Sequence, residues 1–428
     1  MSDALQWREQ TADALSPAAV PEPAVSGSSI PESSVAEPAA PAGFAAEPAW
    51  AAVGSLTLGV FGLVTAEFLP ASLLTPMAAD LGISEGTAGQ AVTATATVAL
   101  VASLVVTAAT RAIDRRLVLL AFSVLLVASN LIVAFAPNLA LLLVGRVLLG
   151  AALGGFWAMS AALAMRLVPE ALVPRALSIM FSGVSAATIF AAPVGSYVGH
   201  LFGWRVVFLI AAALAVVTLV AQFATLPKMA PSGTARLRTL VDVLRRPGIA
   251  IGVLCAMLVF TGHFAFFTYI RPYLETVTGV GISAVSGILL GFGAANFAGT
   301  LLAGPLLERS LRLTLVAMPL LMGALGLGLV MLQGTPGLDS VLIALWGLAF
   351  GAVPVAWSTW LTRTVPDQAE TAGGLLVAAV QFAISLGAAG GGLIFDLDGV
   401  SSVFAASSAV LLAATLIILV GVRSRRTA

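Results

Sequence analysis

WAAVGSLTLGVFGLVTAEFLPASLL, residues 50–74, contains one charged side chain, that of Glu67. As a helix, a stretch of about 20 apolar residues crosses a hydrocarbon core about 30 Å thick. The same character continues through the chain, which is 59% hydrophobic and 9% charged, with a mean hydropathy of +1.05. Soluble domains have about 25% charged residues. The composition therefore predicts a polytopic membrane protein.

Twelve apolar runs follow one another from Trp50 onward. Only helices and closed barrels satisfy the backbone in lipid, and the runs are continuous rather than alternating, so they predict an all-α protein. The expected transmembrane helices lie near 50–74, 87–110, 117–136, 138–165, 172–200, 204–226, 249–273, 283–306, 312–333, 338–362, 372–395 and 400–422.

The remaining segments divide the chain into two six-helix halves, 49–226 and 249–422. Residues 1–48 are rich in Pro, Ala, Ser and Glu, which predicts a disordered tail and no signal peptide. The linker 227–248 contains RLRTLVDVLRR, which predicts an amphipathic helix on the inner membrane surface or a solvated tether. Residues 423–428 form a basic tail.

Positive charge is distributed unevenly over the loops. With an even number of spans both termini share one side, and that side holds every Lys and Arg except Arg146, Arg205 and Arg271. The positive-inside rule assigns that side to the cytoplasm. We expect a multi-pass protein of the cell (plasma) membrane, the inner membrane in a bacterium, with both termini cytoplasmic and the lipid bilayer as its surroundings.

Several classes of function are disfavoured. A net charge of zero provides no field for nucleic acid. The one cysteine, Cys255, cannot form an intrachain disulfide, and the sequence has no metal-ligand spacing and no nucleophile–base motif. We expect no cofactor, no metal, no nucleic-acid partner and no enzyme activity, and we expect a monomer.

The two halves resemble each other at a nearly constant offset. Arg166 and Pro169 correspond to Arg363 and Pro366, and TAEF (65–68) corresponds to TGHF (261–264). Gly150, Gly154 and Gly195 correspond to Gly347, Gly351 and Gly392, 197 residues later, which is the same separation as between Arg166 and Arg363. Parallel six-span repeats predict two pseudo-symmetric halves around a central cavity, with the substrate near the membrane midplane.

Glu67 is the one acidic residue well inside a predicted span, since the others lie in the tail, in loops or at span ends. A carboxylate at the bilayer centre costs about 2.5–3.5 kcal/mol on insertion scales, so it faces the protein interior and usually marks an ion or proton pathway. Arg146 lies at a matching depth in the fourth span. We predict a Glu67–Arg146 interaction, direct or through water, that takes part in proton coupling; the alternative is a static buried pair that fixes helix packing.

His263 occupies the position of Glu67 in the second half. An imidazole titrates near physiological pH, so His263 is a candidate for substrate contact or proton transfer. The alternative is a hydrogen-bonded packing histidine.

A further set of residues is predicted to line the substrate cavity. For the aromatic residues of this set, the alternative is a position at the membrane interface or facing lipid. For the two amide side chains, the alternative is an interhelical hydrogen bond. The set is Phe156, Trp157, Phe264, Phe267, Tyr269, Asn296, Trp357 and Gln381.

The same residues carry a family resemblance over about 50–422. Three stretches resemble motifs of the major facilitator superfamily. They are TAEFLP followed by MAADLGIS; GRVLLGAALGGFWAMSAALAMRLVP (145–169), with its arginine and glycines; and SGVSAATIFAAPVGSYVG (182–199) followed by GWR..F. They are most similar to the superfamily's twelve-span drug–proton antiporter branch, near the sugar-efflux and chloramphenicol-resistance proteins. The resemblance implies the major facilitator fold and transport by alternating access.

The gating motifs depart from that family's pattern in places. TRAIDRRLVLL (110–120) keeps the charges but lacks the matching glycines, GPLLERSLR (304–312) keeps the pattern better, and Ala192 replaces a glycine before Pro193. Pro193 is expected to bend its helix, and the glycines to allow close, sliding packing or simply tight packing. The gating candidates are Asp114, Arg115, Arg116, Gly150, Gly154, Gly183, Pro193, Gly195, Gly199, Gly304, Glu308 and Arg309.

The favoured function is proton-coupled efflux, by antiport, of a small neutral or weakly charged compound such as a drug, sugar or nucleoside. Few fixed charges in the spans disfavour highly charged substrates. The alternatives are a uniporter or proton symporter for a sugar or nucleoside and, more remotely, a transporter-derived sensor suggested by the N-terminal tail.

Overall fold

The computed structural model describes residues 48–169, 172–231, 242–332, 334–365, 367 and 369–421. Every regular element within them is a helix. The predictions for the N-terminal tail, for the helix of the linker through residue 241 and for the basic tail lie outside these residues.

The first half contains its six predicted spans, which start and end within about two residues of the expected positions except that α1 continues seven residues beyond its predicted end. They are α1 (Trp50–Leu81), α2 (Glu85–Ala88) with α3 (Gln90–Ala109), α4 (Arg115–Ala134), α5 (Leu139–Leu167), α6 (Val173–Phe202) and α7 (Trp204–Thr225). Polar side chains begin several of these helices: Ser84, Asp114 and Asn138 each accept a backbone N–H of the first turn. Gly203, with φ +87°, makes the sharp turn from α6 into α7 that a side chain would disfavour.

The second half repeats the arrangement with one difference in continuity. Its helices are α9 (Ile249–Thr268) with α10 (Ile270–Thr276), α11 (Ile282–Met331), α12 (Pro336–Thr364), α13 (Ala369–Asp398) and α14 (Val400–Gly421). Helix α11 contains two predicted spans, because Ser310 has extended backbone (φ −167°, ψ 109°) and kinks the chain there. Eleven helices among the described residues are long and apolar enough to cross a membrane, and they provide twelve spans. The protein is a multi-pass membrane protein.

The internal repeat is visible in the packing. A Cβ on Gly150 would lie 2.4 Å from the Thr95 carbonyl oxygen, and one on Gly347 would lie 2.5 Å from that of Phe292. The same correspondence holds one turn on, where Gly154 meets Ala99 and Gly351 meets Asn296. The α3–α5 and α11–α12 pairs are therefore equivalent close contacts between helix backbones.

These contacts predict a contrast between two glycine substitutions. A Cβ at Gly154 would lie 2.1 Å from the Ala99 carbonyl oxygen, whereas one at Gly304 meets nothing within 4 Å. Overpacking costs about 1–3 kcal/mol, so Gly154→Ala should lower the apparent Tm of the detergent-solubilised protein. Gly304→Ala should leave Tm unchanged or raise it, since alanine favours a helix over glycine by about 0.5–1 kcal/mol. Equal Tm values would contradict the packing assigned to Gly154.

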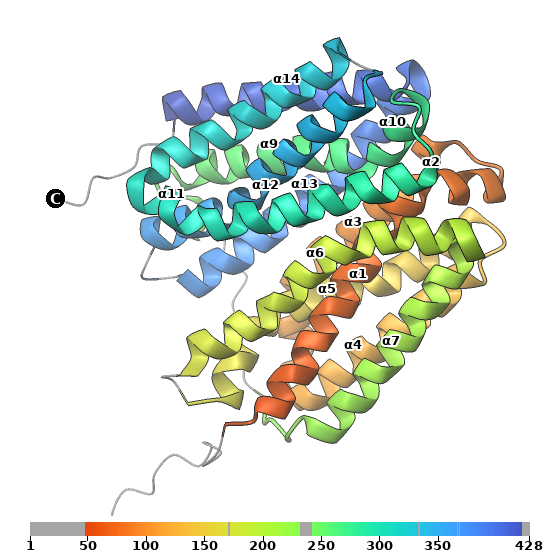
Figure 1. Ribbon diagram of the computed structural model, residues 1–428. Helices are drawn as coiled ribbons and strands as arrows, with labels where there is room; N and C mark the ends of the chain where they lie inside the picture. The colour runs from red at the N-terminus through yellow and green to blue at the C-terminus, as the bar shows by residue number, and fades with distance from the viewer. Residues whose placement is uncertain are drawn as a thin grey trace, which may run out of the picture. The chain divides into compact units, whose positions relative to one another are not determined.

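The two halves, coloured red to green (α1–α7) and green to blue (α9–α14) in Figure 1, contact each other through α3 and α13, α6 and α11, α2 and α13, and α1 and α10. Among the described residues, their hydrogen bonds lie toward the end at which α1 finishes, where Figure 1 shows α2 and α10. We call this interface the seam. It comprises Phe68, Ser72, Ser84, Gly86, Thr97, Phe267, Tyr269, Arg271, Gln381, Ser385 and Asp396.

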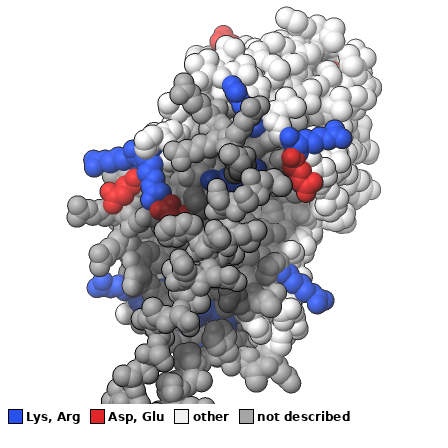
Figure 2. Space-filling view, turned by 90° about the vertical axis from the view of Figure 1, so that its left-hand side faces the viewer, with Lys and Arg blue, Asp and Glu red and all other residues white. Residues whose placement is uncertain are grey.

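The opposite end of the helices, the basic end, carries the cations. In Figure 2, which faces this end, Lys and Arg side chains project at several places. Its described cations are Arg111, Arg115, Arg116, Arg166, Arg175, Lys228, Arg245, Arg246, Arg309, Arg312 and Arg363. The seam end carries Arg205 and Arg271 together with Asp80, Glu85, Glu275, Asp339, Asp396 and Asp398. The predicted charge asymmetry therefore coincides with the two ends of the helices.

Candidate functional site

Glu67 lies at the inner edge of the seam. Its carboxyl is half-buried on α1 and lies close to the Arg146 charge of α5 and to the side-chain amide of Gln381 on α13. The next residue, Phe68, meets Phe267 of α9 edge-on, with ring centroids 5.5 Å apart. The carboxyl thus has one partner in its own half and one in the other half.

The guanidinium of Arg146 is completely buried among three helices. It donates to the Ala66 carbonyl oxygen at 3.0 Å, and its Nε donates to Thr95 Oγ1 at 3.0 Å and to the Ala91 carbonyl oxygen at 3.3 Å. Arg146 thus lies close to Glu67, but its hydrogen bonds go to the carbonyl of the residue before Glu67 and to two oxygens of α3 rather than to the Glu67 carboxylate. Its Nη2 has no hydrogen-bond partner among the described residues, so one donor remains for an ionised carboxylate.

The Arg146–Ala66 bond follows from the last residue of TAEFLP. In a helix the carbonyl of residue 66 accepts the N–H of residue 70, and Pro70 has none. Pro70 therefore leaves an acceptor free one residue before Glu67, and Arg146 fills it.

His263 is buried within an aromatic cluster of the second half. Its Nδ1 accepts the Trp346 indole N–H at 3.1 Å, and its ring stacks on Phe350 with centroids 3.3 Å apart. Phe264, Phe267 and Phe292 surround it. These contacts favour the packing alternative over a role in proton transfer.

The predicted cavity residues occupy different environments. Phe264 and Phe267 belong to the cluster around His263, and Gln381 reaches Glu67. Trp157 is half-buried and stacks against Phe181 at 5.9 Å. These four residues remain candidates for substrate contact.

The other four predicted cavity residues take part in helix packing. Phe156 and Trp357 are 2% and 1% exposed within the cores of their halves. Asn296 donates to the Gly347 carbonyl oxygen at 3.4 Å, the interhelical hydrogen bond considered as its alternative. Tyr269 is fully buried and donates to the Ala388 carbonyl oxygen at 2.9 Å, next to Gly86.

The predicted gating charges of the first half bind the start of the linker. Asp114 accepts the backbone N–H groups of Arg116 at 2.8 Å and Met229 at 3.1 Å, and Arg115 is buried beside Thr110 and Met159. The Arg116 guanidinium donates to the Phe223 carbonyl oxygen. In this conformation the motif thus ties the linker to its own half.

The other gating candidates divide between packing positions and the surface. Gly183, Gly195 and Gly199 of α6 all face α1, and Pro193 lies within the same helix. Glu308 and Arg309 are exposed at the basic end. Gly304 is exposed and borders open space, so it does not mediate a close helix contact.

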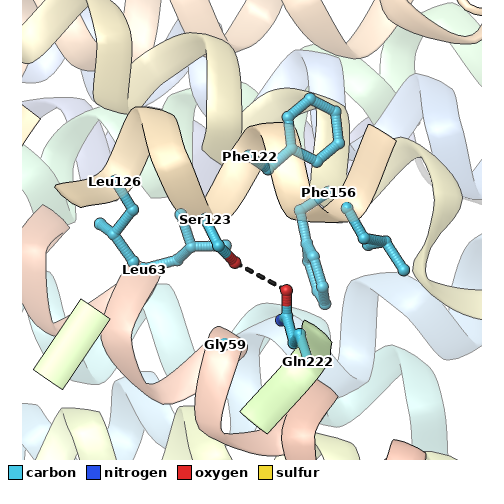
Figure 3. Close-up of a pocket in the computed structure, with 8 residues that line it drawn as sticks. Gly59, Leu63, Phe122, Ser123, Leu126, Phe156 and Gln222 are labelled. Atoms are coloured by element: carbon cyan, nitrogen blue, oxygen red, sulfur yellow. Dashed lines mark hydrogen bonds between the residues drawn. The ribbon is translucent and has the colours of Figure 1, made fainter. Parts of the chain in front are cut away.

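A small pocket inside the first half has a structural lining. Figure 3 shows Ser123 donating to Gln222 Oε1 at 2.7 Å between Gly59, Leu63, Phe122, Leu126 and Phe156. A Cβ on Gly59 would lie 2.7 Å from Gln222 Nε2, so the glycine makes room for the amide. Because its polar groups bind each other, this pocket joins α4 to α7 and offers little to a ligand.

Sequence reasoning missed most polar contacts of the seam. Thr97 and Ser385 share a hydrogen bond at 2.7 Å, Ser84 donates to Asp396 at 2.9 Å, and Arg271 donates to the Ser72 carbonyl oxygen. A Ser or Thr in an apolar run is too common to be predicted as an interface residue from sequence. Arg271 could have been singled out, because it is a cation on the side that is otherwise poor in cations.

Comparison with known proteins agrees with this architecture. The family model described as Major Facilitator Superfamily matches residues 56–388. The chain is 46% identical over 374 residues to proteins named "Purine ribonucleoside efflux pump NepI" from Salmonella paratyphi B, Salmonella enteritidis and Salmonella typhimurium, covering 87% of this chain and 94% of each relative. The chain therefore belongs to the major facilitator superfamily and is a transporter rather than an enzyme.

Proposed function

We propose that this transporter exports purine ribonucleosides from the cytoplasm in exchange for protons. The substrate class is supported by the 46% identity to pumps of that name over 87% of the chain. Proton coupling is supported by the position of Glu67, an ionisable group between Arg146 in its own half and Gln381 in the other half. This position is the observation that carries the proposal.

The proposed orientation follows from charge. With the basic end in the cytoplasm, both termini are cytoplasmic and the seam closes the extracytoplasmic side of the plasma membrane. The conformation is then inward-facing, with Glu67 at the inner edge of the closed seam.

Protonation of Glu67 changes which half holds its side chain. The ionised carboxylate is attracted to the buried Arg146 charge, whose Nη2 is an available donor. Protonation removes that attraction, while the Gln381 amide can still accept the carboxyl proton. The protonated form therefore favours contact between the halves and the inward-facing state. Release of the proton to the cytoplasm returns the carboxylate to Arg146 and loosens the seam for the outward step.

The surroundings of Glu67 suit a neutral aromatic substrate. A purine ribonucleoside is uncharged at neutral pH, so it needs no fixed counter-charge in the membrane. Phe68 follows Glu67 on α1 and contacts Phe267 of α9, which in turn contacts Phe264. Stacking of a base on an aromatic side chain contributes about 1–3 kcal/mol.

The test is transport into inverted membrane vesicles with an acidic lumen. Adenosine, guanosine and inosine should accumulate, and an uncoupler should abolish their accumulation. Uridine, a sugar and chloramphenicol serve as comparison substrates. Accumulation of a comparison substrate but of no purine ribonucleoside would overturn the substrate class. Purine transport unaffected by the uncoupler would overturn proton coupling.

Gln381 supplies a more specific prediction. Gln381→Leu removes the amide that faces Glu67, and the hydrogen bond proposed between this amide and the neutral, protonated carboxyl would contribute about 0.5–1.5 kcal/mol. Proton-driven accumulation should fall by up to about tenfold, while counterflow exchange without a gradient should be retained. Ser385→Ala is the matched control, because it removes a seam hydrogen bond one turn away without contacting Glu67. Equal effects of the two substitutions would contradict a specific role for Gln381.

A further inference from the structure

Helix α1 has two carbonyl oxygens that its own backbone cannot pair. Pro70 and Pro76 lie inside the helix and lack the N–H groups that the carbonyls of Ala66 and Ser72 would accept. An arginine donates to each of them: Arg146 to Ala66 at 3.0 Å, and Arg271 to Ser72.

The two arginines connect different parts of the protein. Arg146 belongs to the first half and also binds α3, so its bond to α1 lies within one half. Arg271 is on α10 of the second half, so its bond to Ser72 crosses the seam. Relative movement of the halves must break the second bond and can preserve the first.

The Arg271 side chain is held in position for this contact. It is 3% exposed, and its Nε donates to Glu275 Oε1 at 2.8 Å one helical turn away. This ion pair lies within the second half, so it persists when the halves separate. The guanidinium can then leave Ser72 without losing its counter-charge, which reduces the cost of opening.

We propose that Arg271 is a gating residue of the transport cycle: its bond to the Ser72 carbonyl that Pro76 leaves free fastens the extracytoplasmic end, and the bond breaks each time that end opens. The inference rests on the alternating cycle of the proposed function but not on the identity of the substrate. It also explains why this arginine lies on the side that is otherwise poor in cations. Other charged groups near the contact are Glu275 on the same helix and Glu85 at the start of α2.

The test measures opening of the seam directly. In a Cys255→Ala background, Ala96→Cys places a reporter in the packed region between the halves, where Ala96 is 1% exposed. A membrane-impermeant maleimide is applied to intact cells and, separately, to inverted vesicles. Arg271→Gln should raise the rate of external labelling about tenfold, the effect expected from losing a charge-assisted hydrogen bond that holds one state.

Two further variants make the result specific. Pro76→Ala restores an N–H within α1 that competes for the Ser72 carbonyl, so it should also raise external labelling, and the double variant should add little to Arg271→Gln. Arg205→Gln is the matched control, because Arg205 lies at the same end but binds Asp80 and the Ala136 carbonyl oxygen within the first half. Its labelling rate should equal that of the parent.

Two outcomes would contradict the proposed gating role of Arg271. One is an external labelling rate in Arg271→Gln equal to that of the parent; the other is a rise in the labelling rate of Arg205→Gln as large as that of Arg271→Gln. If Arg271→Gln does not fold, parental labelling in Pro76→Ala overturns the proposal by itself. Labelling requires no substrate and no proton gradient, so failure of purine ribonucleoside transport leaves this test intact.

Discussion

Glu67→Gln is expected to abolish proton-driven accumulation of substrate, reducing it to the level of vesicles without the transporter. Glutamine has the size of glutamate and can still bind Gln381, but it neither binds nor releases a proton. The halves can then exchange substrate down its gradient without coupling to protons. Counterflow exchange should therefore persist while the response to an acidic lumen disappears.

The measurement compares accumulation with counterflow in the same vesicle preparation. Asp242→Asn is the matched control, since it removes a carboxylate that is exposed at the basic end, away from the seam; it should behave as the parent. Glu67→Asp keeps an ionisable group and should retain part of the coupling. Accumulation in Glu67→Gln that still follows the pH gradient would exclude Glu67 as the proton carrier.

Loss of folding must be distinguished from loss of coupling, because Arg146 is buried. Removing one member of a buried charged pair costs about 3–5 kcal/mol when the other charge is left uncompensated. Arg146 keeps its bonds to Ala66, Ala91 and Thr95 in the variant, so part of that cost is offset. Retained counterflow shows that the variant folds and alternates.

The span positions could be predicted from sequence because lipid imposes a single strong constraint. Apolar runs of sufficient length must become helices, and the helices start and end within a few residues of the expected positions, as at Trp204–Thr225. The division within α11 was also visible, since Ser310 falls between two predicted runs. The repeat was visible because glycines at close helix contacts have no tolerated substitute.

The site was predictable only where a residue is anomalous in lipid. Glu67 and Arg146 were found because each charge is costly there, and their equal depth predicted proximity. Pro70 shows from the sequence that the Ala66 carbonyl lacks its helical partner, whereas the structure is needed to show that Arg146 binds it. The aromatic residues could not be assigned, because a tryptophan packs equally well in a core, as Trp357 does, or in a cavity. The facing pairs of the seam, such as Thr97 and Ser385, depend on how the halves meet.

A disulfide across the seam is expected to stop transport completely. Thr97 Oγ1 on α3 and Ser385 Oγ on α13 are 2.7 Å apart, so cysteines at both positions bring their sulfur atoms close to bonding distance. In a Cys255→Ala background these two are the only thiols, because the chain has a single native cysteine. Oxidation should reduce transport to background, and a reductant should restore it, since the bond prevents the halves from separating at this end.

The chain offers a matched disulfide that does not cross the seam. Ser55 Oγ on α1 and Thr225 Oγ1 on α7 are 2.9 Å apart within the first half. Oxidation of Ser55→Cys/Thr225→Cys links two helices that move together in a rocking cycle, so transport should continue. Mobility on a non-reducing gel shows whether each bond has formed, and each single-cysteine variant controls for oxidation itself. If both bonds form and both variants transport equally, the halves do not separate between α3 and α13, and the opening must occur elsewhere. Loss of transport in the Thr97–Ser385 pair alone makes separation at this seam an obligatory step of the cycle.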